Sequence, residues 1–406
     1  MNDLVTADRD RTASGLQSRS FWTAASVPAL ALWGSGASTP VYPIYRTDWG
    51  LSQVEATTVF AVYPLALALV LACFGGVSDR VGRRAAMLAG VVSIAAGALV
   101  FGVAPDLGLV IVGRALMGVG VGLGLSPATA VMVAHASHAP PGRSSSIATA
   151  STAIGLAFAT FIGGALVEYA PAPLHFSYWV LFAVAVVVLL MLLRLPPDRP
   201  ARILSEQKKD GRLPAESRGV LVRASISIAA AYSLGALELS LGADIGKTLV
   251  GTSNAFVIGS VISLTSLVIG VVALAARRLS ARISGVFGGI ASVAATATLI
   301  GAAQASSLLL FVGFALLGGI AYSLLFASGI AALASSIPES FRATSLSTAY
   351  LVGCVIQVAV ALSLGVVATT WGLLEGVSAG LPVVGGVGAI ALITNVLPPV
   401  RRDHRR

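Results

Sequence analysis

The feature that most constrains this chain is a series of long apolar segments separated by short polar ones. A transmembrane helix needs about 20 mostly apolar residues. Backbone N–H and C=O groups find no partner in the bilayer core, so a spanning segment must be helical or part of a closed barrel. The sequence therefore predicts an all-α membrane protein with twelve transmembrane helices. The segments are residues 21–45, 55–77, 86–104, 107–134, 144–167, 174–194, 223–246, 253–276, 283–303, 307–335, 343–369 and 376–397.

Composition agrees with a membrane protein. Of the 406 residues, 56% are hydrophobic and 11% are charged, whereas a soluble domain carries about 25% charged residues. The net charge of +9 would suit a nucleic-acid binder, but the basic residues lie between the apolar segments, where they set membrane topology. We expect a lipid bilayer as partner and no nucleic acid. Cys73 and Cys354 both lie in apolar context, so no disulfide is expected.

The placement of arginine and lysine predicts an orientation. If twelve spans alternate, nearly all basic residues fall on one side of the membrane, and the other side receives only Arg46 and Lys247. Basic residues favour the cytoplasmic side. We therefore predict a multi-pass protein of the cell membrane with both termini in the cytoplasm.

A polar interruption divides the spans into six plus six. Residues 196–219 are rich in charge and proline, which predicts an N-terminal bundle over 1–195, a cytoplasmic linker over 196–222 and a C-terminal bundle over 223–406. The two halves also repeat. RSSSIATA at Arg143–Ala150 matches RATSLSTA at Arg342–Ala349, and RALMG at Arg114–Gly118 matches FALLG at Phe314–Gly318. Parallel repeats of this kind build transporters with a binding site near the membrane midplane.

The loop between the second and third spans reads GGVSDRVGRR from Gly75 to Arg84. A carboxylate here can meet a helix N-terminus or a basic side chain, which would latch the helix ends in one state. Glycine allows the sharp turn and close approach that such a contact needs. The alternative is a plain charge cluster that only sets topology. The residues assigned to the latch are Gly75, Asp79, Arg80, Gly82, Arg83 and Arg84.

This loop resembles the signature of the major facilitator superfamily, in the pattern GxxxDRxGRR. GRALMGVG at Gly113–Gly120 resembles the fourth-span motif of the drug:proton antiporters in that family. The fifth-span segment Gly155–Gly164 departs from their motif, because Ala159 and Thr160 stand where glycine and proline are expected. The resemblance implies alternating access, with the first, fourth, seventh and tenth helices lining the pathway.

Arg114 and Glu238 are the most informative charges. At about 1.5 Å rise per residue, Arg114 lies about 12 Å from Asp106 and Glu238 about 13 Å from Lys247. A charge in mid-membrane costs about 2.5–3.5 kcal/mol on insertion scales, so it should face a cavity or a partner. Burial disfavours a charged carboxylate, which would let Glu238 take up and release protons near neutral pH. The alternatives are a static ion pair, or an Arg114 that only ties helix backbones together.

Other polar and small residues are candidates for the pathway or for packing. Asp244, close to Lys247, is interpreted as part of an ion pair at the rim. The spacing of Gly118, Gly120, Gly122 and Gly124 is typical of close helix packing. The candidate pathway residues, each with helix–helix contact as its alternative, are Tyr42, Tyr232, Tyr322 and Gln357.

These features predict a proton-coupled secondary transporter that exports small lipophilic or amphipathic molecules. Few charges line the predicted pathway, which disfavours highly charged substrates. An uptake symporter for a neutral metabolite is the alternative, and a membrane sensor or scaffold on a transporter fold is a further one. The sequence contains no GxxxxGK[ST] phosphate loop and no catalytic or metal-ligating constellation at membrane depth. We expect no enzymatic activity, cofactor or metal, and a monomer whose partners are protons and a small-molecule substrate.

Overall fold

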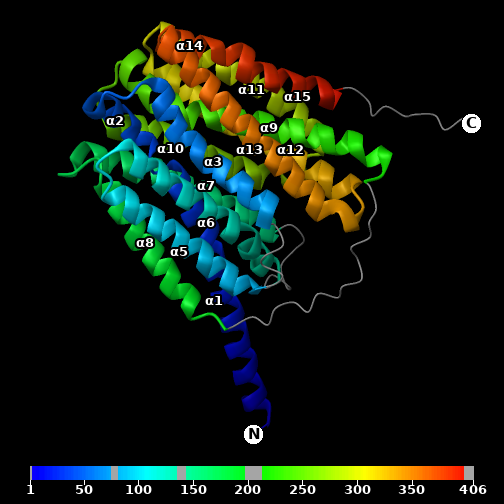
Figure 1. Ribbon diagram of the computed structural model, residues 1–406. Helices are drawn as coiled ribbons and strands as arrows, with labels where there is room; N and C mark the ends of the chain where they lie inside the picture. Colours follow the sequence, from blue (N-terminus) through cyan, green and yellow to red (C-terminus); the bar gives the residue numbers. More distant parts are fainter. Residues whose placement is uncertain (1, 75–80, 135–142, 197–212, 397–406) are drawn as a thin grey trace, which may run out of the picture. The chain divides into compact units, whose positions relative to one another are not determined.

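The structure is a computed structural model, and it describes residues 2–74, 81–134, 143–196 and 213–396 (Figure 1). The described residues form helices and connecting turns, with no strand among them. Eleven of the described helical segments are long and apolar enough to cross a membrane. The predicted all-α membrane fold is confirmed.

Except for α1, the helices of the first half of the sequence begin and end close to the predicted spans. They are α1 (Asn2–Gly36), the 3-10 turn η1 (Thr39–Val41), α2 (Tyr42–Trp49), α3 (Gln53–Phe74), α5 (Arg83–Gly102), α6 (Leu107–Ala134), α7 (Arg143–Tyr169) and α8 (Phe176–Leu193). The first predicted span, 21–45, is not one helix, because α1 ends at Gly36 and the chain restarts in η1 and α2. Pro40 has no N–H to donate to the carbonyl oxygen of Gly36, four residues earlier, which favours the end of α1 at that residue.

The second half has the same succession. Its helices are α9 (Ala215–Asp244), the π-helix η2 (Ile245–Leu249), α10 (Ala255–Ala275), the 3-10 turn η3 (Ala276–Arg278), α11 (Ala281–Gln304), α12 (Leu308–Ser336), α13 (Glu339–Thr370), α14 (Leu373–Gly380), the π-helix η4 (Leu381–Gly385) and α15 (Gly386–Val396). α9 begins eight residues before the predicted span at 223. The last span is interrupted by η4, which contains Pro382 and its missing N–H.

Contacts group the chain into two compact units. Unit 1 comprises Met1–Trp49, Val62–Ile203 and Ala255–Ser266, and unit 2 comprises Gly50–Ala61, Leu204–Asn254 and Leu267–Arg406. α3 and α10 are therefore each divided between the units, with one end of the helix in unit 1 and the other end in unit 2. In unit 1, α5 packs against both α6 and α8, and α1 packs against α6 and α7 (Figure 1).

Glycines on α6 bring three helices of unit 1 into close contact. A Cβ on Gly120 would lie 2.5 Å from the carbonyl oxygen of Gly90 on α5. Gly118 meets the backbone of Tyr63 on α3 in the same way, and Gly122 meets the side chain of Val70. Alternate glycines thus face different neighbours, which confirms that this spacing serves packing.

Unit 2 is built around α9, which packs against α12, α13 and α15. One buried cluster joins the start of α9 to α12 and α13, and its members are Ala224, Ile228, Leu333, Ile337 and Ala349. α11 lies against α12, where a Cβ on Gly288 would lie 2.9 Å from the backbone nitrogen of Leu325. The side chains of mid-α9 are therefore enclosed by other helices of this unit.

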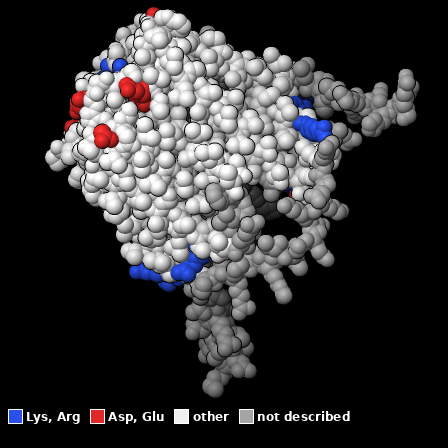
Figure 2. All heavy atoms as spheres, in the orientation of Figure 1, with Lys and Arg blue, Asp and Glu red and all other residues white. Residues whose placement is uncertain are grey.

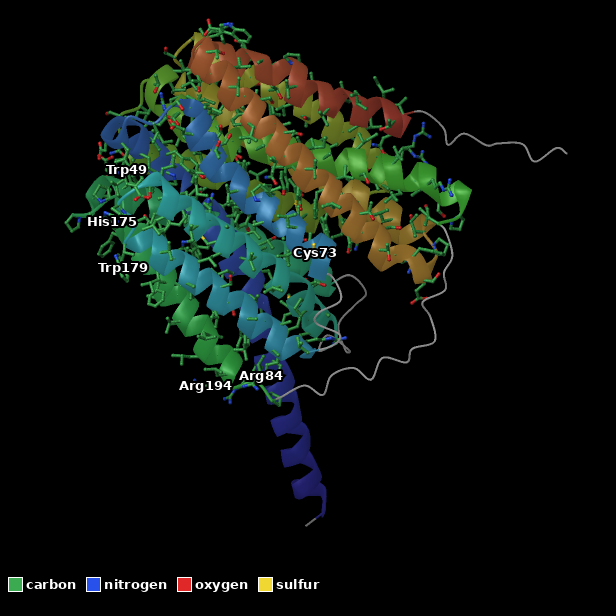
Figure 3. The ribbon with its side chains drawn as sticks, viewed as in Figure 1. Trp49, Cys73, Arg84, His175, Trp179 and Arg194 are labelled. Carbon is green, nitrogen blue, oxygen red and sulfur yellow. The ribbon has the colours of Figure 1, made fainter. Side chains whose placement is uncertain are left out.

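The two ends of unit 1 differ in the side chains that they carry. Figure 3 shows Trp49, His175 and Trp179 at one end, and Arg84 and Arg194 at the other. Most of the surface seen in Figure 2 belongs to residues that are neither acidic nor basic. Interfacial tryptophans at one end and arginines at the other are typical of a membrane-spanning bundle.

Candidate functional site

Arg114 is fully buried in unit 1 (0% exposed) and is held by the end of α1. Its Nη1 donates to the carbonyl oxygen of Gly34 (2.8 Å), and its Nη2 donates to the carbonyl oxygen of Ser35 (3.0 Å). Nη2 also donates to the hydroxyl of Tyr42 (3.0 Å), and the guanidinium carbon lies 5.3 Å from the ring centroid of Tyr63. The planar guanidinium is suited to this, because its fork of donors can bind several oxygens at once.

The break after α1 explains why these carbonyls need a donor. The last four C=O groups of a helix have no intrahelical partner, and α1 ends at Gly36. Gly34 and Ser35 lie in that last turn, in buried surroundings where water cannot replace a donor. Arg114 therefore connects the end of α1 to α6 and holds Tyr42, which is itself only 1% exposed.

Glu238 lies in the last third of α9 in unit 2 and is 7% exposed. Asp244, expected at a rim, is also buried (1% exposed), where α9 passes into η2. Lys247 in η2 is exposed. Glu238 is thus a carboxylate in the interior of a spanning helix, where an ionised form is costly.

Three of the four predicted pathway residues come together in unit 2. The rings of Tyr232 on α9 and Tyr322 on α12 lie nearly parallel, with their centroids 6.3 Å apart. A Cβ on Gly235 would lie 3.4 Å from Cε2 of Tyr322 and 3.9 Å from Nε2 of Gln357, so both side chains border this glycine. Tyr42, the fourth, belongs to unit 1 and binds Arg114.

The signature loop is described only at its end. Gly75, Asp79 and Arg80 lie outside the described residues. Gly82 precedes α5 with φ of 93°, a left-handed conformation that favours glycine. Arg83 is exposed. Arg84 reaches the end of α8, where Nε donates to the carbonyl of Leu192 (3.2 Å) and Nη2 to that of Leu193 (2.8 Å).

The second half of the chain has an equivalent arginine. Arg282, at the start of α11, donates from Nη2 to the carbonyl oxygen of Val396 at the end of α15 (2.6 Å). In each unit an arginine in the first turn of one helix thus binds the carbonyl end of another, where cations are favoured.

Two capping contacts escaped the sequence analysis. Glu168 at the end of α7 accepts a hydrogen bond from the backbone nitrogen of Ala255 in unit 1 (2.7 Å). In unit 2, Oγ1 of Thr369 on α13 accepts from the backbone nitrogen of Val54 (2.9 Å). Each side chain satisfies one free N–H at the start of a helix remote in sequence.

Two aromatic residues were also missed. The ring centroid of Phe326 on α12 lies 6.2 Å from those of Tyr232 and Tyr322, and the ring of Tyr350 on α13 lies 6.0 Å from that of Phe326. Phe326 follows Tyr322 by four residues, which places both on one face of α12. That spacing was the signal for Phe326, whereas Tyr350 joins the group only through the packing of α13 on α9.

Comparison with known proteins identifies the family. The sequence profile of the Major Facilitator Superfamily matches residues 25–284. The chain belongs to this superfamily. Two solved structures are similar over 94% of this chain: the nucleoside transporter NupG, with a TM-score of 0.70 and 13% identity over 98% of that chain, and a bacterial homologue of the human lysosomal transporter Spinster, with a TM-score of 0.69 and 15% identity over 95% of that chain.

Curated relatives match parts of the sequence. The multidrug efflux pump LfrA of Mycolicibacterium smegmatis is 32% identical over 157 residues, which cover 38% of this chain and 30% of that protein. The puromycin resistance protein pur8 of Streptomyces alboniger is 29% identical over 203 residues, or 49% of this chain and 38% of that protein. The matches thus span less than half of these relatives. Membership of the superfamily makes the protein a multi-pass membrane transporter.

Proposed function

We propose that this transporter exports small lipophilic or amphipathic molecules in exchange for protons. The observation that carries the proposal is the buried carboxylate of Glu238 on α9, within the unit that gathers Tyr232, Tyr322 and Gln357. The names of the two relatives, an efflux pump and a drug-resistance protein, support export. The aromatic and amide side chains suit an uncharged or weakly polar substrate, because none of them supplies a full charge.

Proton coupling follows from the cost of burying the Glu238 charge. A carboxylate with little access to water favours its neutral form, so Glu238 takes a proton when its cavity opens to the proton-rich side. It releases that proton when the cavity opens to the other side and water returns. Binding of substrate beside Gly235, one helical turn away, would compete with the protonated state and link the two fluxes.

Arg114 takes a positioning role in this proposal. Its hydrogen bonds to Gly34, Ser35 and Tyr42 fix the end of α1 against α6. A change in that contact would move α1, a helix that the family resemblance assigns to the pathway. Arg114 thus acts on coupling by holding a pathway helix in place.

Alternating access requires contacts that open and close at the helix ends. We take the moving bundles to be residues 1–195 and 223–406, joined by the 196–222 linker. The hydrogen bonds from Ala255 to Glu168 and from Val54 to Thr369 each join a helix of one bundle to a helix of the other. These two hydrogen bonds would break in the conformation that opens to the opposite side of the membrane. The loop Gly75, Asp79, Arg80, Gly82, Arg83 and Arg84 is proposed as the latch at the arginine-bearing end.

The arginine-bearing end of unit 1 is proposed to face the cytoplasm. Arg84 and Arg194 lie at that end, opposite Trp49 and Trp179 (Figure 3), which supports a cytoplasmic location for both termini. A cell membrane is the proposed location. Both repeats are present in one chain, which supports a monomer as the working unit.

The test is transport in sealed vesicles that contain the purified full chain, with a pH gradient imposed in either direction. Export predicts substrate flux opposed to proton flux, and Glu238→Gln should abolish the part of the flux that depends on the gradient. Glu375→Gln is the matched control, because Glu375 is an exposed carboxylate on α14. Substrate and protons moving together would replace export with uptake by symport. Flux of every compound without proton dependence would overturn coupling.

A further inference from the structure

The turn between α10 and α11 in unit 2 carries three arginines within six residues. Arg277 and Arg278 lie in η3, Arg282 lies in the first turn of α11, and all three are exposed. We call these three residues the arginine tip. The sequence from Ile245 to Pro338 contains no aspartate or glutamate, so no carboxylate on α10, α11 or α12 neutralises the tip. The corresponding loop of the first half differs, because it contains Asp79 among its arginines.

The arginine tip has many hydrogen-bond donors that take no partner from the described part of the chain. Arg277 donates from Nε to the carbonyl oxygen of Leu274 (2.9 Å), and Arg282 donates from Nη2 to that of Val396 (2.6 Å). Arg278 makes no hydrogen bond or ion pair with any residue that the structure describes. Each guanidinium carries five N–H groups and no acceptor. The tip is therefore suited to an anion with several oxygens.

Apolar side chains lead away from the arginine tip along both helices. On each helix, three exposed apolar residues recur at intervals of three or four, which puts them on one face. Both helices are long and apolar enough to cross a membrane, so these faces contact lipid chains. The six side chains, each 42–66% exposed, are Leu267, Val271, Leu274, Ile283, Phe287 and Ile290. We call them the apolar strips.

The length of the strips matches one leaflet of a bilayer. At about 1.5 Å rise per residue, Leu267 lies about 15 Å from Arg277, and Ile290 lies about 12 Å from Arg282. One leaflet of the hydrocarbon core is about 15 Å thick. A phospholipid with its acyl chains along the strips would thus bring its headgroup to the level of the arginines. A soluble anion would use the arginines alone.

We propose that the arginine tip and the apolar strips bind an anionic phospholipid. Its phosphate lies among the three guanidinium groups, because arginine binds phosphate oxygens in pairs, and its acyl chains lie along α10 and α11. Basic side chains at the headgroup level favour anionic over zwitterionic lipids. The alternative is that these arginines only set membrane topology and stay in water. Lipid binding here is independent of the proposed export, because it requires no transport.

The test is native mass spectrometry of the purified full chain in detergent, titrated with phosphatidylglycerol or phosphatidylcholine of the same acyl chains. The first phosphatidylglycerol should bind about tenfold more tightly than the first phosphatidylcholine. Arg277→Gln and Arg278→Gln should each raise the Kd for phosphatidylglycerol about fivefold, while Arg278→Lys, which keeps the charge, should lose less. Arg218→Gln is the matched control, because it removes one exposed arginine from the start of α9 and should leave the Kd unchanged.

The outcomes distinguish a lipid site from general attraction of charge. Equal affinities for the two lipids, or equal losses in Arg278→Gln and Arg218→Gln, would overturn the site. Glycerol phosphate carries the phosphate without acyl chains, and its displacement of the lipid at equal concentration would overturn the role of the strips. Loss of proton-linked transport with unchanged lipid binding would overturn only the export proposal. Thermal unfolding checks the fold of each variant, and if Arg277→Gln unfolds, Arg278→Gln decides the result.

Discussion

The middle of unit 1 and the middle of unit 2 use polar side chains in opposite ways. In unit 1, Arg114 is fully buried, and two backbone carbonyls and a tyrosine hydroxyl accept its hydrogen bonds. In unit 2, the amide of Gln357 has no partner in the described part of the chain, and the rings beside it are partly exposed. The difference teaches that a buried charge does not by itself indicate a ligand.

The largest expected effect tests the hydrogen bonds that Arg114 makes in unit 1. Arg114→Met removes the donor for Gly34, Ser35 and Tyr42, and should cost about 2–5 kcal/mol of stability because buried oxygens are left without partners. The measurement is the thermal unfolding of the purified protein. Arg114→Lys keeps the charge but not the planar fork, and should recover only part of the loss. Glu238→Gln should leave the unfolding temperature nearly unchanged. Equal stability of Arg114→Met and wild type would contradict a positioning role.

A smaller effect is expected when a methyl group is added to one glycine in each unit. At Gly120 the new Cβ would lie 2.5 Å from a carbonyl oxygen, so Gly120→Ala should destabilise the protein by about 1–3 kcal/mol. At Gly235 the nearest atom would be a ring carbon at 3.4 Å, so Gly235→Ala should be neutral or stabilising by up to about 1 kcal/mol. Unfolding curves of both variants check this. Similar losses of stability at the two positions would mean that Gly235 is packed as tightly as Gly120.

The smallest effect concerns the ends of the units, which resemble each other. Arg84→Gln and Arg282→Gln each remove charged donors from a helix C-terminus, and each should cost about 0.5–2 kcal/mol. Arg84 donates to the carbonyls of Leu192 and Leu193, and Arg282 donates to that of Val396. The loss of stability should therefore be larger for Arg84→Gln. Chemical denaturation of the two variants gives the ranking. A loss of stability in only one of the two variants would show that the two arginines are not equivalent.

Much of the fold was predictable because the bilayer limits the options. Segments of about 20 apolar residues had to be helices, and most of the predicted spans differ from the observed helices by only a few residues. The exceptions involve proline. Pro40 follows the end of α1, and Pro382 lies in η4. Proline can kink, interrupt or end a helix, and the neighbouring helices decide which outcome is stable.

The sequence by itself determined which residues carry charge or hydrogen-bonding groups at membrane depth. Arg114, Glu238 and Gln357 stand out in any apolar segment. Tertiary structure alone decided that Arg114 binds the end of α1, that Glu168 and Thr369 cap remote helices, and that Phe326 lies beside Tyr232 and Tyr350 beside Phe326. The physical reason is the distance along the sequence over which each property is determined. Hydropathy acts along the chain and can be read locally, whereas a hydrogen bond or ring contact depends on which helices pack together and on the rotation of each about its axis.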